Sequence, residues 1–300
     1  MTAQSRLDSE IAVVILSFNR AEELLRTVAH TVALPERPRV IVVDNGSTDG
    51  SAQLVAKRFP WVRVIALPRN VGAAARNIGA IMAGTQYVAF SDDDTLWTGG
   101  SLQAAVKILR EHPRVGVISA RILVGARKED PASRAMASSP LPSAGYPGRV
   151  VIGFMAGACV FRRCAFQESG GYEPKLFIGG EEALLALDLA TRGWAMLYSD
   201  ALIVFHYPSN YRDAAARTRL LTRNAIWVGW LRRHYMSAAH QTVRALVRGA
   251  RDRSVRRGCI DALKDMHWVM QQRRTVPAHV ESSWLQIERW LARDAKASRT

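Results

Sequence analysis

The chain has 300 residues, 48% of them hydrophobic, which is enough to bury the core of one large domain or of a domain with an appendage. Its three cysteines suit neither a disulfide framework nor a zinc site and indicate reduced thiols. The N-terminal residues lack the order of a signal peptide, and no stretch reaches the roughly 18 apolar residues of a transmembrane helix. We therefore expect a cytoplasmic protein, at most peripheral at the inner face of the membrane.

The formal net charge of +15 is unevenly distributed along the chain. Residues 1–210 hold 22 Lys and Arg against 19 Asp and Glu, whereas residues 211–300 hold 19 against 7. A change of this size predicts a boundary near residue 210. We expect a domain at 1–210 followed by a basic, α-helical extension at 211–300.

Short β-branched runs alternate with helical patterns from residue 11 onward. Strands are predicted at 11–18, 39–44, 61–67 and 86–91, with helices between them. This alternation predicts an α/β fold with a mostly parallel, Rossmann-like sheet flanked by helices. Ligands bind beyond the carboxyl ends of the strands in such sheets. That edge is predicted to carry Ser17, Asn19, Arg20, Asp44, Asp92, Asp93 and Asp94.

The second half of this domain has a less regular pattern. A helix at about 100–111 and a strand at 115–119 precede residues 125–149, whose prolines and serines predict a mobile surface loop. Buried strands are expected within 150–161, then a helix from Glu181 and two more strands at 195–200 and 201–207.

The three consecutive aspartates at 92–94 have two interpretations. An Asp-rich turn could cap the helix that follows Gly100. Alternatively, carboxylates at the end of a strand could bind a hard cation such as Mg²⁺ or Mn²⁺, which usually shares its ligands with phosphates. The position at a strand end favours the cation site.

Three other segments carry residue types suited to chemistry. Glu181 and Glu182 open a predicted helix, where the helix dipole alone accounts for one acidic residue and where a carboxylate could also be a general base. His206 suits either a buried hydrogen bond or a metal site. Asn70 and Arg76 could contact phosphate or sugar, although the segment 69–79 does not have the spacing of a dinucleotide fingerprint or P-loop.

The order of these motifs resembles that of family 2 glycosyltransferases with the GT-A fold. Over roughly residues 11–210, the segments are VVILSFNR, VVDNGSTDGS, RNVGAAARNIG, SDDD and GGYEPKLFIGGEEALLALDL, followed by a histidine at a strand end. The resemblance implies an inverting, metal-dependent enzyme that moves a sugar from a nucleotide-diphosphate sugar to an acceptor hydroxyl. It also implies a single in-line displacement at the anomeric carbon.

The resemblance assigns roles to the candidate residues. It implies that the DxD motif is Asp92 and Asp94, with Asp94 on Mg²⁺ or Mn²⁺ and Asp92 or His206 beside it. The acidic pair would supply the base, and we prefer Glu182 over Glu181 because it aligns with the usual one. The family's usual Glu-Asp is Glu-Glu here, and Asp188 stands where an arginine is common. Donor contacts are expected from Ser17, Asn19, Arg20, Asp44, Asn70, Arg76, Asp92 and Asp93.

The basic C-terminal segment also has alternatives. Its helices could simply pack their tryptophans against the core, or bind an anionic membrane surface where a lipid-linked acceptor would reside. Nucleic-acid binding is disfavoured because no nucleic-acid module is recognisable. Arg217, Arg223 and Asn224 are further candidates for contact with the donor diphosphate or the acceptor. A glycan, a lipid-linked sugar and a small molecule all stay open as the acceptor.

Two other functions are alternatives to sugar transfer. A sugar-phosphate nucleotidyltransferase usually has a basic, glycine-rich loop after the first strand, and SFNRAEE at 17–23 is not one. A non-catalytic nucleotide-sugar- or carbohydrate-binding module is disfavoured because both acidic sites are intact. We therefore expect an enzyme of cell-surface glycan or glycoconjugate synthesis.

Overall fold

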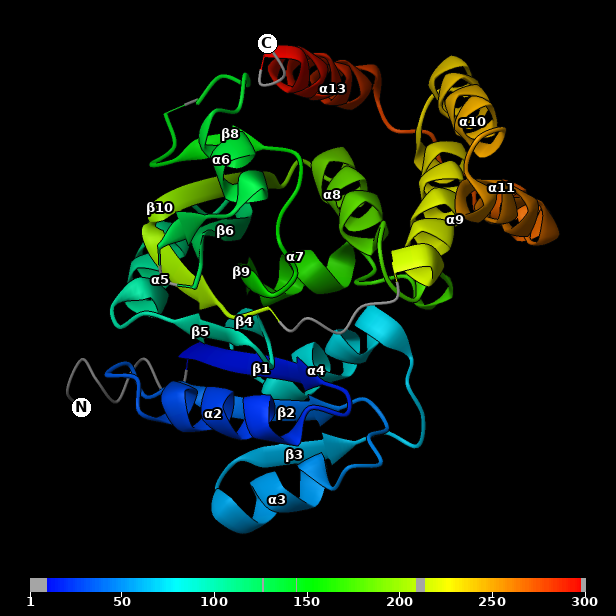
Figure 1. The fold of residues 1–300 in the computed structure, drawn as a ribbon. Coiled ribbons are helices and arrows are strands. Elements are labelled where there is room, and N and C mark those ends of the chain that lie inside the picture. Colours follow the sequence, from blue (N-terminus) through cyan, green and yellow to red (C-terminus); the bar gives the residue numbers. More distant parts are fainter. Residues whose placement is uncertain (1–9, 126, 144, 209–213, 298–300) are drawn as a thin grey trace.

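The computed structural model describes residues 10–125, 127–143, 145–208 and 214–297 (Figure 1). Its first half alternates strands with helices, as predicted. The elements are β1 (Ile11–Ser17), α2 (Ala21–Val32), β2 (Arg39–Asp44), α3 (Ser51–Arg58), β3 (Arg63–Ala66), the 3₁₀ turn η1 (Gly72–Ala74), α4 (Ala75–Ala83), β4 (Tyr87–Asp92), β5 (Thr95–Trp97) and α5 (Ser101–Glu111).

The second half begins with short strands and ends in helices. Its elements are β6 (Val115–Val124), β7 (Lys128–Glu129), α6 (Pro131–Ala137), β8 (Arg149–Val151), β9 (Ala158–Arg162), α7 (Arg163–Glu168), the 3₁₀ turn η2 (Pro174–Leu176), α8 (Glu181–Thr191) and β10 (Ala195–His206). The C-terminal helices are α9 (Ala214–Arg232), α10 (Tyr235–Gly249), α11 (Arg253–Lys264), α12 (Met266–Gln271) and α13 (Ala278–Ala297).

The strands form one mixed sheet with the order β3-β2-β1-β4-β9-β6-β10-β5, to which β7 and β8 add at β6 and β10. The four strands from β3 to β4 run parallel, as the Rossmann-like prediction requires. Strand β9 is antiparallel to both β4 and β6, whereas β10 is parallel to β6. The predicted α/β fold is therefore confirmed, with a sheet that is parallel in one half and mixed in the other.

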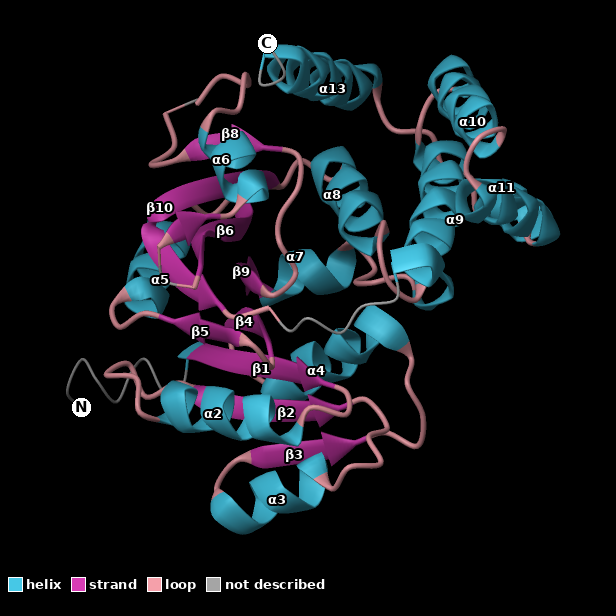
Figure 2. Ribbon diagram, in the orientation of Figure 1, coloured by secondary structure: helices cyan, strands magenta, loops and turns pink. Residues whose placement is uncertain are grey.

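Helices cover both faces of the sheet (Figure 2). One hydrophobic cluster joins β1 and β2 to α2, α3 and α5, and a second joins the opposite face to α4, α7 and α8. Strand β1 is buried along nearly its whole length because its apolar side chains pack against helices on both faces of the sheet. This packing fixes the strand ends, and therefore the polar residues that follow them.

Two sequence-based expectations about the second half were wrong. Residues 125–149 are not one irregular loop, because Asp130 caps α6 by accepting a hydrogen bond from Ala132 N–H at 2.8 Å, and α6 packs beside β6, β8 and β10. The two strands expected at 195–200 and 201–207 form the single strand β10, whose pairing with β6 shifts between Ser199 and Ile203. The irregularity begins at the polar Ser199-Asp200 step.

A third hydrophobic cluster joins the C-terminal helices to the sheet domain. Leu184 and Leu187 of α8 pack with Trp227 and Leu231 of α9 and with residues of α11 and α13. Arg232 of α9 pairs with Asp188 of α8 at 2.5 Å and 3.1 Å. The basic segment therefore contains packed helices, in line with the interpretation that its tryptophans pack against the core. The boundary predicted near residue 210 falls on 209–213, outside the described residues.

Candidate active site

Strand pairing brings the aspartate triplet next to His206. Asp92 is the last residue of β4, and Asp93 and Asp94 form the turn into β5. Because β5 pairs antiparallel with β10, His206 lies opposite Thr95. The Tyr207 N–H donates to the Asp94 carbonyl at 2.9 Å. Residues 112 positions apart in the chain thus meet at one strand end.

Positively charged and imidazole groups surround the two buried aspartates. Arg20 Nη1 lies 2.9 Å from both Asp93 Oδ1 and Asp94 Oδ2, and His206 Nε2 lies 3.5 Å from Asp94 Oδ1. The triplet does not cap helix α5, whose N-cap is Gly100 without a side-chain hydrogen bond. The interpretation of the triplet as a helix cap is therefore wrong.

The two aspartates differ in charge state. Burial acts to raise the pKa of Asp94, but the contacts with His206 and Arg20 outweigh it and hold that pKa below its ordinary value. Burial raises the pKa of Asp93 to about 7, although Arg20 opposes the shift. Asp94 is accordingly the carboxylate of the pair that stays ionised at neutral pH.

Asp92 faces away from this pair, toward the other side of the site. Its half-exposed carboxylate forms an ion pair with the buried guanidinium of Arg76. A Cβ atom on Gly157 would lie 2.3 Å from Asp92 Oδ2, so only a glycine leaves room for the carboxylate there. Arg76 is engaged by a carboxylate, and its predicted contact with phosphate stays a prediction.

Glu182 reaches the same region from helix α8. Its Oε1 accepts a hydrogen bond from the Ala156 N–H at 2.6 Å, and Ala156 directly precedes the glycine that touches Asp92. Burial raises the pKa of Glu182 to about 7, the Glu181 carboxylate adds to the shift, and the Ala156 N–H opposes it. Within the described part of the chain, Oε2 of Glu182 has no hydrogen-bond partner.

Glu181, the other member of the acidic pair, is also buried. It is 5% exposed, and its Oε2 is buried without a hydrogen-bond partner among the described residues. Burial raises the pKa of Glu181, while the charges of Arg76 and Arg217 act in the opposite direction. Among the described residues, Glu181 therefore has a buried oxygen without a partner, whereas Glu182 has a backbone donor on one of its two carboxylate oxygens.

The loops after β1 and β2 hold each other at the same edge of the sheet. Asp44 accepts hydrogen bonds from the N–H and the hydroxyl of Ser47, and Asn19 accepts one from the Thr48 N–H at 2.8 Å. Asn70 accepts a bond from the Gly72 N–H at 2.8 Å within its own turn. Ser17 is buried at the end of β1. These predicted donor residues share one edge, and their contact with a nucleotide stays a prediction.

Sequence reasoning missed two residues that shape this edge. Asn45 joins two loops, because its Nδ2 donates to the Gly72 carbonyl at 3.0 Å and its Oδ1 accepts from the Val71 N–H at 2.9 Å. Its place directly after a predicted strand could have indicated it. Gly157 carried no such signal, since only the folded chain brings it against Asp92.

Asn224 has a different place from the one expected. Asn224 is fully buried, and its Nδ2 donates to the carbonyls of Leu176, Ile178 and Gly179 at 2.7, 3.1 and 2.5 Å. Arg223 Nη2 donates to the Leu176 carbonyl at 3.1 Å. Both residues hold the loop that leads into Glu181. The expectation that the buried Asn224 reaches the donor or acceptor is therefore wrong, whereas the same expectation for Arg217 and the half-buried Arg223 stays a prediction.

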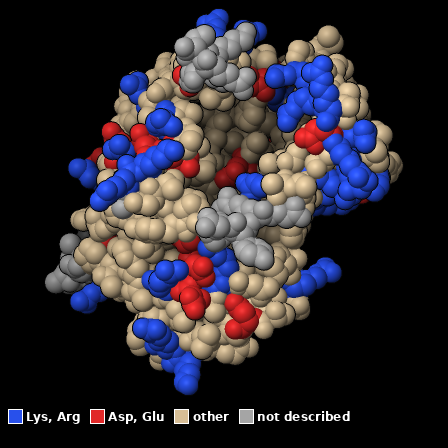
Figure 3. Space-filling model, in the orientation of Figure 1, with Lys and Arg blue, Asp and Glu red and all other residues tan. Residues whose placement is uncertain are grey.

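A hollow opens on the face shown in Figure 3, with acidic side chains on its floor and basic ones gathered over the C-terminal helices. Among the described residues, no three His, Cys, Asp or Glu side chains converge as a closed metal site. The metal ligands available here are a carboxylate and an imidazole, those of Asp94 and His206. This set fits an open site that takes its other ligands from phosphate and water.

Residues 12–170 match the family model described as glycosyl transferase family 2. The chain belongs to this family. The predicted family and enzyme class, a glycosyltransferase, are thereby confirmed. The match includes the aspartate triplet and ends before α8, so the assignment of Glu181 and Glu182 depends on the geometry described above.

Similar proteins extend the match beyond these residues. The N-acetylglucosaminyl-diphospho-decaprenol L-rhamnosyltransferase of Mycobacterium tuberculosis is 27% identical over 297 residues, covering 82% of this chain and 97% of that protein. The mannosyltransferase PcManGT from Pyrobaculum calidifontis, solved with GDP-Man and Mn²⁺, has a TM-score of 0.55 at 18% identity. The similarity covers 97% of this chain and 81% of the PcManGT chain.

A third similar structure is GalNAc-T7 with UDP, GalNAc and Mn²⁺, with a TM-score of 0.57 at 18% identity over 74% of this chain and 48% of that one. Both structural likenesses confirm the GT-A-type fold. No described helix combines the length and apolar character needed to cross a bilayer.

Proposed function

We propose that this glycosyltransferase is an inverting, metal-dependent enzyme with Glu182 as its general base. The observation that carries the proposal is the convergence of Glu182 and Asp92 on either side of Ala156 and Gly157. A base and a donor site on adjoining surfaces are what an in-line displacement requires.

Glu182 has the properties of a base that works near neutral pH. Its pKa of about 7 lets an appreciable fraction be ionised while the carboxylate still accepts a proton readily. The Ala156 N–H fixes one oxygen, so that the other can accept the proton of the acceptor hydroxyl. The acceptor oxygen then bonds to the anomeric carbon as the bond from that carbon to the diphosphate oxygen breaks. The nucleoside diphosphate leaves with both bonding electrons.

Asp94 and His206 would hold Mg²⁺ or Mn²⁺ at the opposite side of the donor. The 3.5 Å between Asp94 Oδ1 and His206 Nε2 is compatible with two ligands on one ion, since Mg²⁺–oxygen bonds are about 2.1 Å long. A divalent ion there would neutralise the charge that develops on the leaving diphosphate. Arg20 keeps Asp94 ionised and in place, and Asp44 and its Ser47 partner would contact the nucleoside.

The experiment is a comparison of nucleotide binding with and without Mn²⁺. UDP-, GDP- and dTDP-sugars are first screened for Mn²⁺-dependent hydrolysis, and the affinity for the matching nucleoside diphosphate is then measured by calorimetry. We expect Asp94→Asn to lower the Mn²⁺-dependent affinity by about 100-fold or more, because even residues behind the ligands contribute about 10- to 100-fold. Asp93→Asn is the matched control and should keep its Mn²⁺ dependence. Full Mn²⁺-dependent affinity in Asp94→Asn would contradict the metal assignment.

We infer that the acceptor is a lipid-linked sugar of cell-surface glycan synthesis. The inference is supported by the relative from Mycobacterium tuberculosis, whose name specifies a diphospho-decaprenol-linked sugar. The match with this chain covers 97% of that protein. An acceptor of this kind is confined to a membrane surface. The enzyme must therefore approach that surface to act.

We further propose peripheral membrane contact through α11 and the turn before it. Residues 250–264 hold five Lys and Arg against two Asp. Arg251, Arg253, Arg256 and Arg257 are exposed there, beside the exposed apolar side chains of Ile260 and Leu263. This combination suits an anionic lipid surface. A cytoplasmic location, on the inner face of the membrane, stays a prediction.

A further inference from the structure

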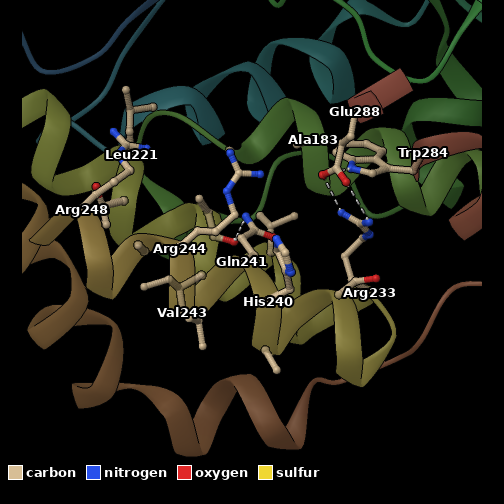
Figure 4. Close-up of a pocket in the computed structure, with 18 of the residues that line it drawn as sticks. Ala183, Leu221, Arg233, His240, Gln241, Val243, Arg244, Arg248, Trp284 and Glu288 are labelled. Atoms are coloured by element: carbon tan, nitrogen blue, oxygen red, sulfur yellow. Dashed lines mark hydrogen bonds and ion pairs between the residues drawn. The ribbon is translucent and has the colours of Figure 1, made fainter. Parts of the chain in front are cut away.

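A large cavity lies between α9, α10 and α13, outside the donor edge of the sheet (Figure 4). Its volume is about 1240 Å³, well above the roughly 300 to 1,000 Å³ of most small-molecule sites. Its walls are largely apolar and include Leu221, Ile226, Val228, Met236, Val243 and Leu285. The size and lining indicate a long apolar ligand.

The cavity reaches the start of helix α8, which carries the proposed base. Gly180 and Ala183 line the cavity, and these two residues flank Glu181 and Glu182 in the chain. A ligand in the cavity can therefore present a polar end group at the start of α8. The loop that leads into α8 is held by Asn224, so this end has a fixed shape.

The rim of the cavity carries cations. Arg244 and Arg248 lie one helical turn apart on α10 and are exposed (Figure 4). Neither has a carboxylate partner in the described ranges. Arg233, by contrast, is buried between Glu281 and Glu288, with bonds of 2.8 and 3.0 Å. The cavity thus has a satisfied buried arginine and two arginines available to an anionic ligand.

The outer mouth lies along an unpartnered apolar face of α10. Met236 is 83% exposed and Val243 is 57% exposed, seven residues apart and therefore on the same side of the helix. Both also line the cavity. Leaving such side chains in water costs free energy that an apolar ligand would recover.

We propose that this cavity binds the isoprenyl diphosphate part of a lipid-linked acceptor. The apolar walls hold the isoprenoid units, Arg244 and Arg248 pair with the phosphates, and the attached sugar points toward Glu182 at the Gly180 end. The inference rests on the proposed function and adds to it the location of the acceptor. Charge complementarity at the rim selects an anionic lipid over a neutral one.

The test measures binding of geranylgeranyl diphosphate to the 300-residue chain by calorimetry, below the micellar concentration. We expect inorganic pyrophosphate alone and geranylgeraniol alone to bind at least about tenfold more weakly, because each offers only half of the interaction. Val243→Asp and Arg248→Glu should each weaken binding by about tenfold or more. Both side chains are exposed, and circular dichroism checks that the variants fold.

Matched controls are Leu54→Asp and Arg58→Glu on α3, which make the same kinds of change at exposed residues outside the cavity and outside the proposed membrane contact. We expect both to bind the probe as the parent protein does. Absence of probe binding to the parent protein, or equal affinities in the cavity variants and the controls, would overturn the inference. Mn²⁺-dependent donor hydrolysis by the parent protein is measured in parallel. Its absence would instead count against the proposed function, so the two failures are distinguishable.

Discussion

Glu182 has a raised pKa because it is an acid placed next to another acid in a poorly hydrated part of the protein. Burial and the Glu181 carboxylate disfavour its charge, while the Ala156 N–H and Arg76 partly restore it. Asp92 adds a further negative charge on the far side of Gly157. Burial raises the pKa of Glu181 as well, so the contact with the Ala156 N–H beside Asp92, and not the direction of the shift, distinguishes Glu182.

This shift predicts the pH dependence of donor hydrolysis. The base works in its deprotonated form, so kcat/KM should rise about tenfold per pH unit below pH 7 and level off above it. An ordinary glutamate, with a pKa of about 4.3, would give a flat profile over this range. Hydrolysis of the donor sugar between pH 5.5 and 8.5 measures the profile. A rate that is independent of pH from 5.5 to 7.5 would argue against Glu182 as the base.

At the scale of elements, the loop between η2 and α8 determines where the acidic pair lies. Phe177 has a positive φ of 64°, an uncommon conformation for a non-glycine residue. Its carbonyl accepts a hydrogen bond from the Ala73 N–H at 2.7 Å, and Asn224 binds the carbonyls on either side of it. The loop is thus held by η1 from one side and by α9 from the other.

Gly72 is the close-contact position of this arrangement. A Cβ atom there would lie 2.0 Å from the Phe177 carbonyl oxygen, and its φ is +67°. We expect Gly72→Ala to cost about 1–2 kcal/mol for the backbone conformation plus about 1–3 kcal/mol for the clash. Donor hydrolysis should fall as well, because the loop leading to Glu182 must move.

The matched control for this prediction is Gly50→Ala. Gly50 also has a positive φ, +81°, but nothing lies within 4 Å of a Cβ atom placed on it. Its variant should lose only the backbone contribution and keep its hydrolysis rate. Urea unfolding measures both free energies. Equal losses in the two variants would show that the contact between Gly72 and Phe177 contributes nothing to stability.

At the scale of the whole molecule, the basic residues of the C-terminal helices divide into packed and exposed ones. Trp227 is buried, its Nε1 donates to the Ala262 carbonyl at 2.9 Å, and Arg223 stacks over its ring at 4.3 Å. Several basic residues of this segment are thus structural. The arginines of α11 stay exposed, and Figure 3 shows basic side chains gathered over these helices.

The proposed membrane contact through the exposed arginines predicts how the protein should interact with lipid vesicles. Co-sedimentation should show binding to phosphatidylglycerol vesicles but not to phosphatidylcholine vesicles, with loss of binding at high salt. We expect the double variant Arg256→Glu, Arg257→Glu to bind at least about tenfold more weakly, since each basic residue near the surface contributes about 1 kcal/mol. Lys57→Glu, Arg58→Glu on α3 makes the same charge change at exposed residues and is the control. An equal effect of both double variants would indicate a response to net charge alone.

The sequence predicted the parts of the molecule that depend on local pattern. The parallel strands, the position of Asp92–Asp94 at a strand end and the start of α8 at Glu181 all followed from periodicity and motif order. It did not predict β5, which is three residues long and adopts its conformation by pairing with β10. That pairing brings His206 next to Asp94. The sequence therefore predicted which residues belong to the site but not how they are brought together.

Contacts between distant segments were the other part beyond prediction. Asn224 was a candidate for ligand contact, yet its Nδ2 donates to three backbone carbonyls and its Oδ1 accepts from Arg223 Nε. The fit of Gly157 against Asp92 likewise exists only in the folded chain. Periodicity reports which face of an element is buried, and not which partner covers it.

The measurement that tests the central claim most directly is the rate of Mn²⁺-dependent donor hydrolysis in Glu182→Gln beside Glu181→Gln. The two substitutions remove the same charge from adjacent residues, and calorimetry with the nucleoside diphosphate verifies that each variant still binds the donor's nucleotide. We predict that Glu182→Gln lowers kcat by about 10²- to 10⁴-fold, the usual contribution of a general base, and that Glu181→Gln has a much smaller effect. Near-normal kcat in Glu182→Gln, or a larger loss in Glu181→Gln, would contradict the account.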